Sequence, residues 1–239
     1  MNIFITGSSR GLGKAMALHF AQKGHRVVIN GAVNKPAFEA TLKQIQEISK
    51  ESIGFFGDLS DYEVAKDIID NIIKEYGELN ILINNAGREY IGLFSDMKPD
   101  DWNYIINSNI QTMLNCSNIV IPYMLQKKSG HIINISSVWG EVGASCEAVY
   151  SLTKGAMNSF TKALAKELAP SNIMVNAISC GLFDTEMNNC INAEDLSDFT
   201  QKIPLNRAGK PQEIAELAYF LANSSYITAK ILTIDGGLV

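Results

Sequence analysis

The chain has 239 residues, of which 46% are hydrophobic, and a formal net charge of −5. A chain of this length buries a core large enough to need neither disulfides nor a structural metal. Its Lys and Arg residues are spread along the sequence, which argues against a nucleic-acid partner. The longest apolar runs fall short of the roughly 20 residues of a membrane span, and the N-terminus lacks a signal-peptide pattern. We therefore expect a cytoplasmic protein with no membrane partner.

The cysteines and histidines do not suggest a metal site. Cys116, Cys146, Cys180 and Cys190 show no C-x-x-C spacing, and the three histidines are scattered. We therefore expect no bound metal and free thiols in a reducing compartment.

Short β-rich runs alternate with helical patterns along the chain. We expect strands at 2–6, 26–30, 52–57, 80–84, 130–136, 173–179 and 230–234, and helices at 11–23, 36–49, 61–76, 99–126, 148–169 and 211–223. Several strands are continuous apolar runs, as is typical of parallel strands buried on both faces. The alternation predicts an α/β fold, with one domain over residues 1–239 and a doubly wound parallel sheet of about seven strands flanked by helices.

The first strand leads into a glycine-rich turn, Thr6-Gly7-Ser8-Ser9-Arg10-Gly11-Leu12-Gly13, and a helix follows at once. Glycines at such a turn let the backbone approach a pyrophosphate, whose charge the helix N-terminus favours. A mere tight turn is the alternative. The dinucleotide interpretation is favoured because the loop opens the first β-α-β unit.

The end of the second strand bears on which dinucleotide binds. NAD sites place an acid there for the ribose 2′-hydroxyl, whereas NADP sites place a cation near the 2′-phosphate. This strand ends in Asn30 without an acid, Arg10 lies in the glycine loop, and Lys35 follows. NADP(H) is therefore favoured over NAD(H). The alternative is that Arg10 is solvated and the pocket accepts either dinucleotide.

Tyr150 and Lys154 lie one helical turn apart, so their side chains share a helix face. A cation beside a phenol lowers the phenol pKa, which suits the pair to acid–base chemistry. Ser137 follows the fifth strand, at the edge of the sheet where ligands bind, and can orient a carbonyl. Tyr-x-x-x-Lys alone is common on helix surfaces, so the interpretation depends on this context.

Three further features fit a ligand site at this edge. The small residues of Asn84-Asn85-Ala86-Gly87 suit close passage beside a cofactor. Asn109, inside the long fourth helix, can disturb that helix and hold a water. The segment from about 180 to 208 follows a strand and is long and mixed in polarity, which predicts a substrate lid. The alternative is a plain surface excursion.

These motifs together resemble the classical short-chain dehydrogenase/reductase family, and the resemblance runs from the Thr6–Gly13 loop to Ile234-Asp235-Gly236-Gly237. It implies a Rossmann-type fold, a homotetramer or homodimer that pairs helices 99–126 and 148–169, and a catalytic set of Asn109, Ser137, Tyr150 and Lys154. Asn109 would support a proton relay in that set. Asp58 would meet the adenine, and Phe183 and Thr185 the nicotinamide. With Tyr150 and Lys154, the implied cofactor-binding residues are Gly7, Ser9, Arg10, Gly11, Leu12, Gly13, Asn30, Asp58, Leu59, Asn85, Ala86, Gly87, Gly181, Phe183 and Thr185.

Two positions depart from the family pattern. Cys180-Gly181 stands where the family usually has Pro-Gly, which bears on the loop beside the nicotinamide. Thr228-Ala229-Lys230 stands where Thr-Gly-Gln is usual, which bears on local packing and on a subunit interface.

Within the family, the layout resembles 3-oxoacyl-(acyl-carrier-protein) reductases. This implies NADPH-dependent reduction of a small or carrier-bound ketone, with Tyr150 as proton donor. The stretch Ser136–Glu147 also resembles a bacterial subgroup that reduces a 5-aminopentanone group on modified elongation factor P. Ser137 and Tyr150 would contact the substrate carbonyl, and Trp139 and Glu147, at the mouth of the site, would receive a cationic amine.

Other interpretations stay open. Trp139 can instead pack under the lid, and Glu147 can merely begin a helix. A hydroxysteroid or sugar alcohol dehydrogenase is a further alternative, since fold does not fix the substrate. A non-catalytic NADP-binding regulatory protein would be expected to lack one of Ser137, Tyr150 and Lys154, which are all present.

Overall fold

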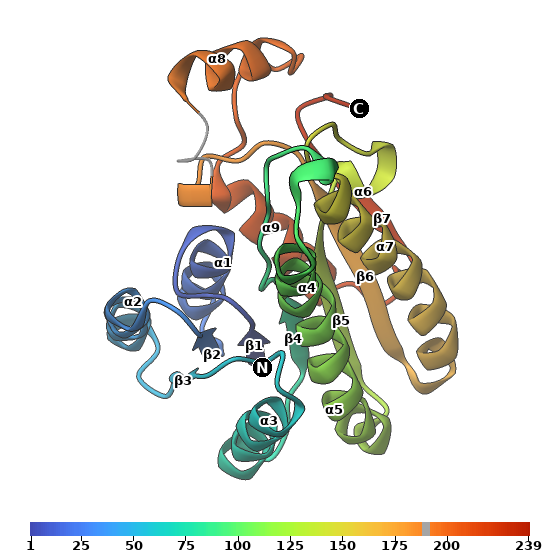
Figure 1. Cartoon of the computed structure of the whole chain (residues 1–239). Helices are drawn as coiled ribbons and strands as arrows, with labels where there is room; N and C mark the ends of the chain where they lie inside the picture. The colour runs from blue at the N-terminus through green and yellow to red at the C-terminus, as the bar shows by residue number, and fades with distance from the viewer. Residues whose placement is uncertain (188–191) are drawn as a thin grey trace.

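The computed structural model describes residues 1–187 and 192–239, and in that part of the chain a seven-stranded parallel sheet forms the centre (Figure 1). The strands stand in the order β3-β2-β1-β4-β5-β6-β7. Their bounds are β1 (Asn2–Ile5), β2 (Arg26–Gly31), β3 (Ile53–Phe56), β4 (Ile81–Asn84), β5 (Gly130–Ser137), β6 (Ile173–Cys180) and β7 (Ile231–Ile234). The predicted doubly wound sheet is confirmed.

The main helices begin and end close to the predicted residues. They are α1 (Gly11–Gln22), α2 (Lys35–Ile48), α3 (Tyr62–Tyr76), α4 (Pro99–Ile106), α5 (Thr112–Lys127), α7 (Ala148–Leu168) and α9 (Pro211–Ala222). Local caps fix several ends. The Asn34 side chain accepts a hydrogen bond from Ala37 N at the start of α2, Asp61 caps α3, and Gly77 ends α3 in the left-handed conformation.

Two short helices and one irregular turn were not predicted. α6 (Trp139–Val142) follows β5, and α8 (Ala193–Gln201) lies inside the expected lid. The predicted helix over 99–126 is interrupted by a π-helical turn, Asn107–Gln111, which separates α4 from α5. Such turns occur often at functional sites. Here the turn includes Asn109, the residue expected to disturb the helix.

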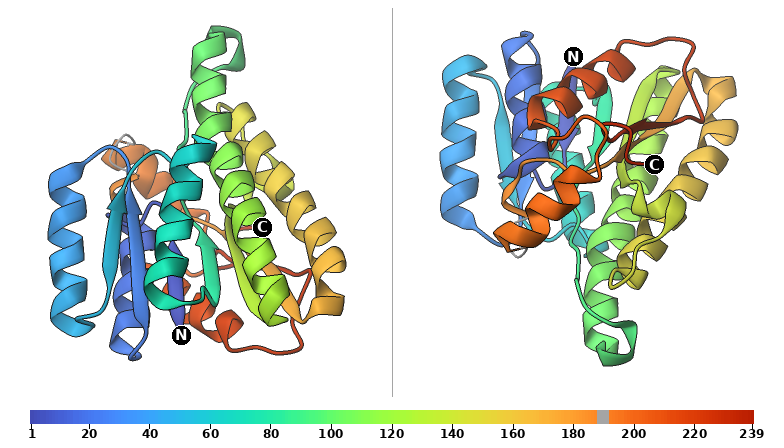
Figure 2. Two further views of the ribbon diagram at one scale, coloured as in Figure 1. Left: turned by 90° about the horizontal axis from the view of Figure 1, so that it is seen from below. Right: turned by 90° about the horizontal axis from the view of Figure 1, so that it is seen from above.

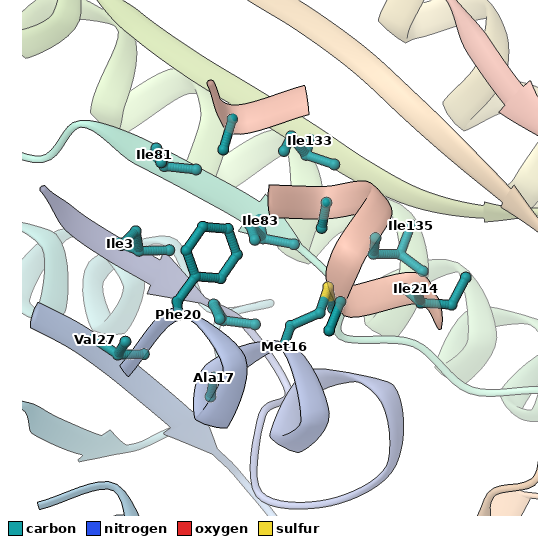
Figure 3. Packing of buried hydrophobic residues seen from close by; sticks show 14 of the residues in the cluster. Ile3, Met16, Ala17, Phe20, Val27, Ile81, Ile83, Ile133, Ile135 and Ile214 are labelled. Atoms are coloured by element: carbon teal, nitrogen blue, oxygen red, sulfur yellow. The ribbon is translucent and has the colours of Figure 1, made fainter. Parts of the chain in front are cut away.

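Two hydrophobic clusters, one on each face of the sheet, form the core. Ile3 and Ile5 of β1 pack toward α1, α2 and α9, whereas Phe4 between them packs toward α3, α5 and α7. Alternate residues of a strand point to opposite faces, so a strand covered on both sides is apolar throughout. Figure 3 shows the first cluster, in which β1, β2, β4 and β5 meet α1 and α9 through Ile3, Val27, Ile81, Ile83, Ile133, Ile135, Met16, Ala17, Phe20 and Ile214.

The strand order reverses between β1 and β4, and doubly wound sheets bind ligands at the carboxyl ends of the strands beside such a reversal. α8 stands apart from the sheet at the top of Figure 1, while α4 and the segment before it project from the body in Figure 2. Within the described ranges, none of the helices has both the length and the hydrophobicity to cross a membrane.

Candidate active site

A pocket of about 810 Å³ opens where the carboxyl ends of the strands meet. Its wall includes nearly all the site residues predicted from the sequence. These are Gly7, Ser9, Arg10, Gly11, Leu12, Asn30, Asp58, Leu59, Asn85, Ala86, Gly87, Ser137, Trp139, Glu147, Tyr150, Lys154, Gly181, Phe183 and Thr185. Gly13 and Asn109 are not among the described residues that line it.

The glycine loop is held to the end of β4 by hydrogen bonds and close packing. Thr6 Oγ1 accepts hydrogen bonds from the backbone N–H groups of Asn85 (3.0 Å) and Ala86 (2.9 Å). Gly7 has a φ of 59°, and a Cβ there would lie 2.7 Å from Ala86 Cα. Only glycine fits this combination of conformation and close approach. A Cβ at Gly13 would lie 2.7 Å from Gly7 O, so Gly13 lets α1 pack against the loop.

The loop fits the pyrophosphate of a dinucleotide. α1 begins at Gly11, directly behind the loop, and no acidic residue lies in its first turn. The first N–H groups of a helix have no partner within it, and Gly11 and Leu12 line the pocket without a competing carboxylate from the same turn. Gly7, Gly11 and Leu12 of the loop line the pocket, so a phosphate there would meet backbone rather than long side chains.

The end of β2 carries amide and apolar groups rather than an acid. The Asn30 side chain is bound from both ends, because Oδ1 accepts from Gly7 N (3.3 Å) and Nδ2 donates to Gly57 O (3.0 Å). Arg10 lines the pocket, and its guanidinium pairs with Glu186 at 3.4 Å, a partner that the sequence analysis missed. Lys35 is not among the described residues on the wall.

Ser137, Tyr150 and Lys154 also line the pocket. Ser137 is the last residue of β5, Tyr150 is the third residue of α7, and the Ser137 hydroxyl is a neighbour of the Tyr150 phenol. Lys154 Nζ lies 5.5 Å from the centre of the Tyr150 ring and donates to Ile135 O at 2.8 Å. A Cβ at Gly140 would lie 2.6 Å from the Lys154 carbonyl carbon, so this glycine lets α6 pack closely on α7.

Burial dominates the acid–base properties of the pair. It raises the pKa of Tyr150, while the neighbouring Ser137 hydroxyl lowers that pKa, and Glu89, Cys180 and Glu147 add to the rise. Burial lowers the pKa of Lys154 to about 8. The expectation that Lys154 brings the Tyr150 pKa below its ordinary value is therefore wrong for this arrangement. The phenol keeps its proton at neutral pH, which is the state of a proton donor.

The Asn109 side chain binds protein groups on both sides. Its Oδ1 accepts from Arg88 N (2.7 Å), and its Nδ2 donates to Arg88 O (2.9 Å) and to Thr153 Oγ1 (3.0 Å). Both amide hydrogens are thus used, so neither is available for the water predicted from the sequence. The side chain instead holds the segment after β4 against α7, beside the pocket wall.

A pair of carboxylates faces the pocket next to Tyr150. Glu147 precedes α7, its side chain does not cap the first turn of the helix, and the neighbouring Trp139 side chain lowers its pKa. Burial, and then the charge of Glu89, raise the pKa of Glu147 to about 7. Glu89 lines the pocket and was missed, although its place after the fourth strand was a usable signal. Trp139 also contacts Phe199 of α8 edge-on, with ring centres 5.9 Å apart.

The segment expected to be a lid has its two ends tied together. Gly209 N donates to Leu182 O and Asp184 N donates to Gly209 O, both at 2.9 Å. Phe199 and Met187 line the pocket between these ends. Residues 188–191 of the expected lid, including Cys190, lie outside the described residues.

The two departures from the family pattern have local consequences. β6 continues through Cys180, whose carbonyl accepts from Val138 N at 3.0 Å, and its thiol is buried. Ala229 has a φ of 61°, a left-handed conformation that favours glycine. Cys116, Cys146 and Cys180 are free thiols. In the described part of the chain, no group of three or more His, Cys, Asp or Glu side chains is placed to hold a metal.

Comparisons with known proteins agree with this geometry. A sequence model of the family described as short chain dehydrogenase matches residues 1–196. A 3-oxoacyl-(acyl-carrier-protein) reductase of Thermotoga maritima is 36% identical over 237 residues, which cover 98% of this chain and 96% of the relative. The enzyme of that name from Staphylococcus epidermidis is 35% identical over 98% of this chain and 97% of its own. One from Chlamydia trachomatis is 36% identical, with 98% and 95% covered.

Proposed function

Because the chain belongs to the short-chain dehydrogenase/reductase family, we propose that it is an NADPH-dependent carbonyl reductase similar to 3-oxoacyl-(acyl-carrier-protein) reductases. As a member of the family it is an oxidoreductase that acts on carbonyl or hydroxyl groups and binds a nicotinamide cofactor. The observation that carries the proposal is that Ser137, Tyr150 and Lys154 line the same pocket as the glycine loop.

The residues on the wall suit a dinucleotide with a 2′-phosphate. The glycine loop and the N-terminus of α1 would hold the pyrophosphate. Asp58 and Leu59 would flank the adenine, and Phe183 and Thr185 the nicotinamide. No carboxylate stands at the end of β2 to repel the 2′-phosphate, and the Arg10 guanidinium on the pocket wall would pair with this phosphate.

The reaction is the reduction of a ketone to an alcohol. When bound, the reduced nicotinamide supplies a hydride to the carbonyl carbon. Ser137 Oγ donates a hydrogen bond to the carbonyl oxygen and orients it. Tyr150 Oη then gives its proton to that oxygen. Burial keeps this proton on the phenol until the oxygen becomes negative. The Lys154 ammonium, 5.5 Å from the centre of the Tyr150 ring, would stabilise the phenolate that remains. Asn109 positions the wall behind this set.

The substrate that we favour is a 3-oxoacyl-type ketone, either small or bound to a carrier. Support comes from relatives that have this activity in their names and that match nearly the whole chain. The family similarity extends through the substrate side of the pocket as well as through the glycine loop. A thioester of acetoacetate is therefore the first substrate to test.

A second candidate is an aminoketone, such as the 5-aminopentanone group on modified elongation factor P. The observation that favours it is the pair Glu89 and Glu147, which lies within electrostatic range of Tyr150. An ammonium placed between two carboxylates and an indole ring, here that of Trp139, gains both ion-pair and cation–π attraction. It would also remove the repulsion between the two acids. A neutral acyl chain gains neither.

We also propose that the chain folds as one domain with a lid at 180–208, and that copies of it associate. The lid would close through Phe199 on Trp139, with its ends held at Leu182 and Gly209. Three leucines on α5 and α7 are exposed, and burying them would explain a dimer or tetramer built on these helices: Leu114, Leu125 and Leu152.

The test is to follow the loss of NADPH with purified protein and either ketone. We expect turnover with the acetoacetyl thioester, and a higher kcat/KM with an aminoketone if the second candidate is correct. NADPH binding without turnover of either ketone would contradict the proposal and favour the non-catalytic regulatory alternative.

A further inference from the structure

Arg10 and Glu186 form an ion pair across the rim of the pocket. Arg10 Nη1 lies 3.4 Å from Glu186 Oε2, and both residues line the pocket. Arg10 is the N-cap residue of α1, and Glu186 follows β6 at the beginning of the lid segment. The pair therefore joins the phosphate-binding loop to the lid, across the route of a bound dinucleotide.

The pair is weak. It has a single hydrogen bond at 3.4 Å, and its side chains are 56% and 61% exposed. Exposed ion pairs of this kind contribute little. A guanidinium binds a phosphate dianion through two parallel hydrogen bonds and with more charge, so a phosphate within reach is the stronger partner.

Arg10 cannot easily serve both partners, because they lie on opposite sides of the glycine loop. The 2′-phosphate of NADP(H) is expected beside the end of β2, and Glu186 follows β6. In the sheet, β2 and β6 lie on opposite sides of β1, from which the loop emerges. A guanidinium turned toward Glu186 is therefore turned away from the phosphate position.

We propose that Glu186 determines how strongly the enzyme prefers NADPH over NADH, by competing with the 2′-phosphate for the Arg10 guanidinium. NADPH binding transfers Arg10 from the carboxylate to the phosphate, whereas NADH leaves the ion pair in place. The inference rests on the proposed use of NADPH through Arg10. Lys14 and Glu186 line the same neighbouring cavity, so a cation stays close to the carboxylate after Arg10 turns away.

A double-mutant cycle tests the competition. The Kd values for NADPH and NADH are measured by fluorescence titration for the unmodified protein, Glu186→Gln, Arg10→Ala and the double variant. We expect Glu186→Gln to tighten NADPH binding by roughly two- to fivefold, the value of a lost surface ion pair. The Kd for NADH should change by less than about 1.5-fold. In the Arg10→Ala background, Glu186→Gln should not affect NADPH.

The control is Glu194→Gln, which removes the same charge from an exposed position on α8 and should leave both Kd values unchanged. The inference is overturned if Glu186→Gln tightens NADH and NADPH equally, if its effect survives in Arg10→Ala, or if it has no effect. The proposed NADPH assignment is tested separately by Arg10→Ala alone. It fails if that variant does not weaken NADPH binding relative to NADH.

Discussion

The two halves of the pocket are built differently. On the glycine-loop side, backbone groups and short polar side chains form a fixed network, in which Thr6, Asn30 and Asn85 bind the ends of β1, β2 and β4 to each other. On the substrate side, long side chains from separate segments meet, such as Glu147, Trp139 and Phe199. A network of backbone contacts tolerates little change in shape, whereas a wall of side chains can change its ligand by substitution. The first half therefore suits an invariant cofactor and the second a variable substrate.

Gly7→Ala is expected to produce the largest effect on the fixed half. The added Cβ would meet Ala86 Cα at 2.7 Å and would occupy a left-handed φ. Strain of about 1–3 kcal/mol at the loop should weaken NADPH binding roughly 5- to 150-fold. Gly24→Ala is the matched control, since Gly24 has a φ of 81° with nothing within 4 Å of its Cβ position. Equal effects of the two substitutions on the Kd for NADPH would contradict the fixed-network view.

Lys154 should make reduction depend on pH. The rate is expected to fall as pH rises through about 8, because the ammonium that stabilises the Tyr150 phenolate loses its proton there. Because burial lowers the pKa of Lys154 from 10.5 to about 8, the folded protein binds fewer protons than the unfolded chain between about pH 8 and pH 10.5, and stability rises with pH over that interval. Burial of the charged Lys154 side chain therefore destabilises the fold most below pH 8. Lys154→Met should lower kcat about 100-fold or more, because the cation beside Tyr150 is lost. It should raise Tm at neutral pH, because the buried charge is lost as well.

The control for Lys154→Met is Lys162→Met, at an exposed position of the same helix, which should change neither property. A flat pH–rate profile from about pH 7 to about pH 9 would argue against the role given to Lys154.

Glu147→Gln tests the variable half. The Glu147 carboxyl group loses its proton as pH rises through about 7, so the attraction of its side chain for a substrate ammonium should grow as the pH rises past that value. The substitution should raise KM for an aminoketone by roughly tenfold, remove this pH dependence, and leave the acetoacetyl thioester unaffected. Because partial burial raises the pKa of Glu147, its carboxylate destabilises the fold above about pH 7, and Glu147→Gln should raise Tm there. Glu39→Gln, on the outside of α2, is the control. Equal loss with both ketones would contradict a cation site.

Ala229→Gly is expected to have the smallest effect, and one confined to stability. Ala229 adopts a φ of 61° next to β7, and glycine accepts this conformation without strain. The free energy of unfolding should rise by about 0.5–1 kcal/mol with kcat unchanged. Ala40→Gly, inside α2, should instead lower stability by about 1 kcal/mol. A loss of stability in Ala229→Gly would show that the methyl group packs favourably.

The strands were predictable because several of them are continuous apolar runs, and the main helices because helical patterns alternate with these runs. The caps of α3, Asp61 and Gly77, are local signals of the same kind. The glycine loop was predictable for the same reason, since its chemistry is local. α6 is too short to show a period, and acidic residues obscure the apolar face of α8.

The missed features join residues far apart in the chain. The Arg10–Glu186 pair and the interaction of Glu89 with Glu147 arise only when β1, β4, β5 and β6 come together. The direction of the Tyr150 pKa was mispredicted because spacing along a helix shows a neighbouring cation but not the extent of burial.

The most direct test of the central claim is Tyr150→Phe, with Tyr226→Phe as the control at a position that is 99% exposed. Ketone reduction and NADPH binding are measured on the same preparations. We expect Tyr150→Phe to lower kcat by about 10²- to 10⁴-fold, because the proton donor is gone, and to leave the Kd for NADPH within about twofold. Full turnover in Tyr150→Phe would contradict the proposed mechanism.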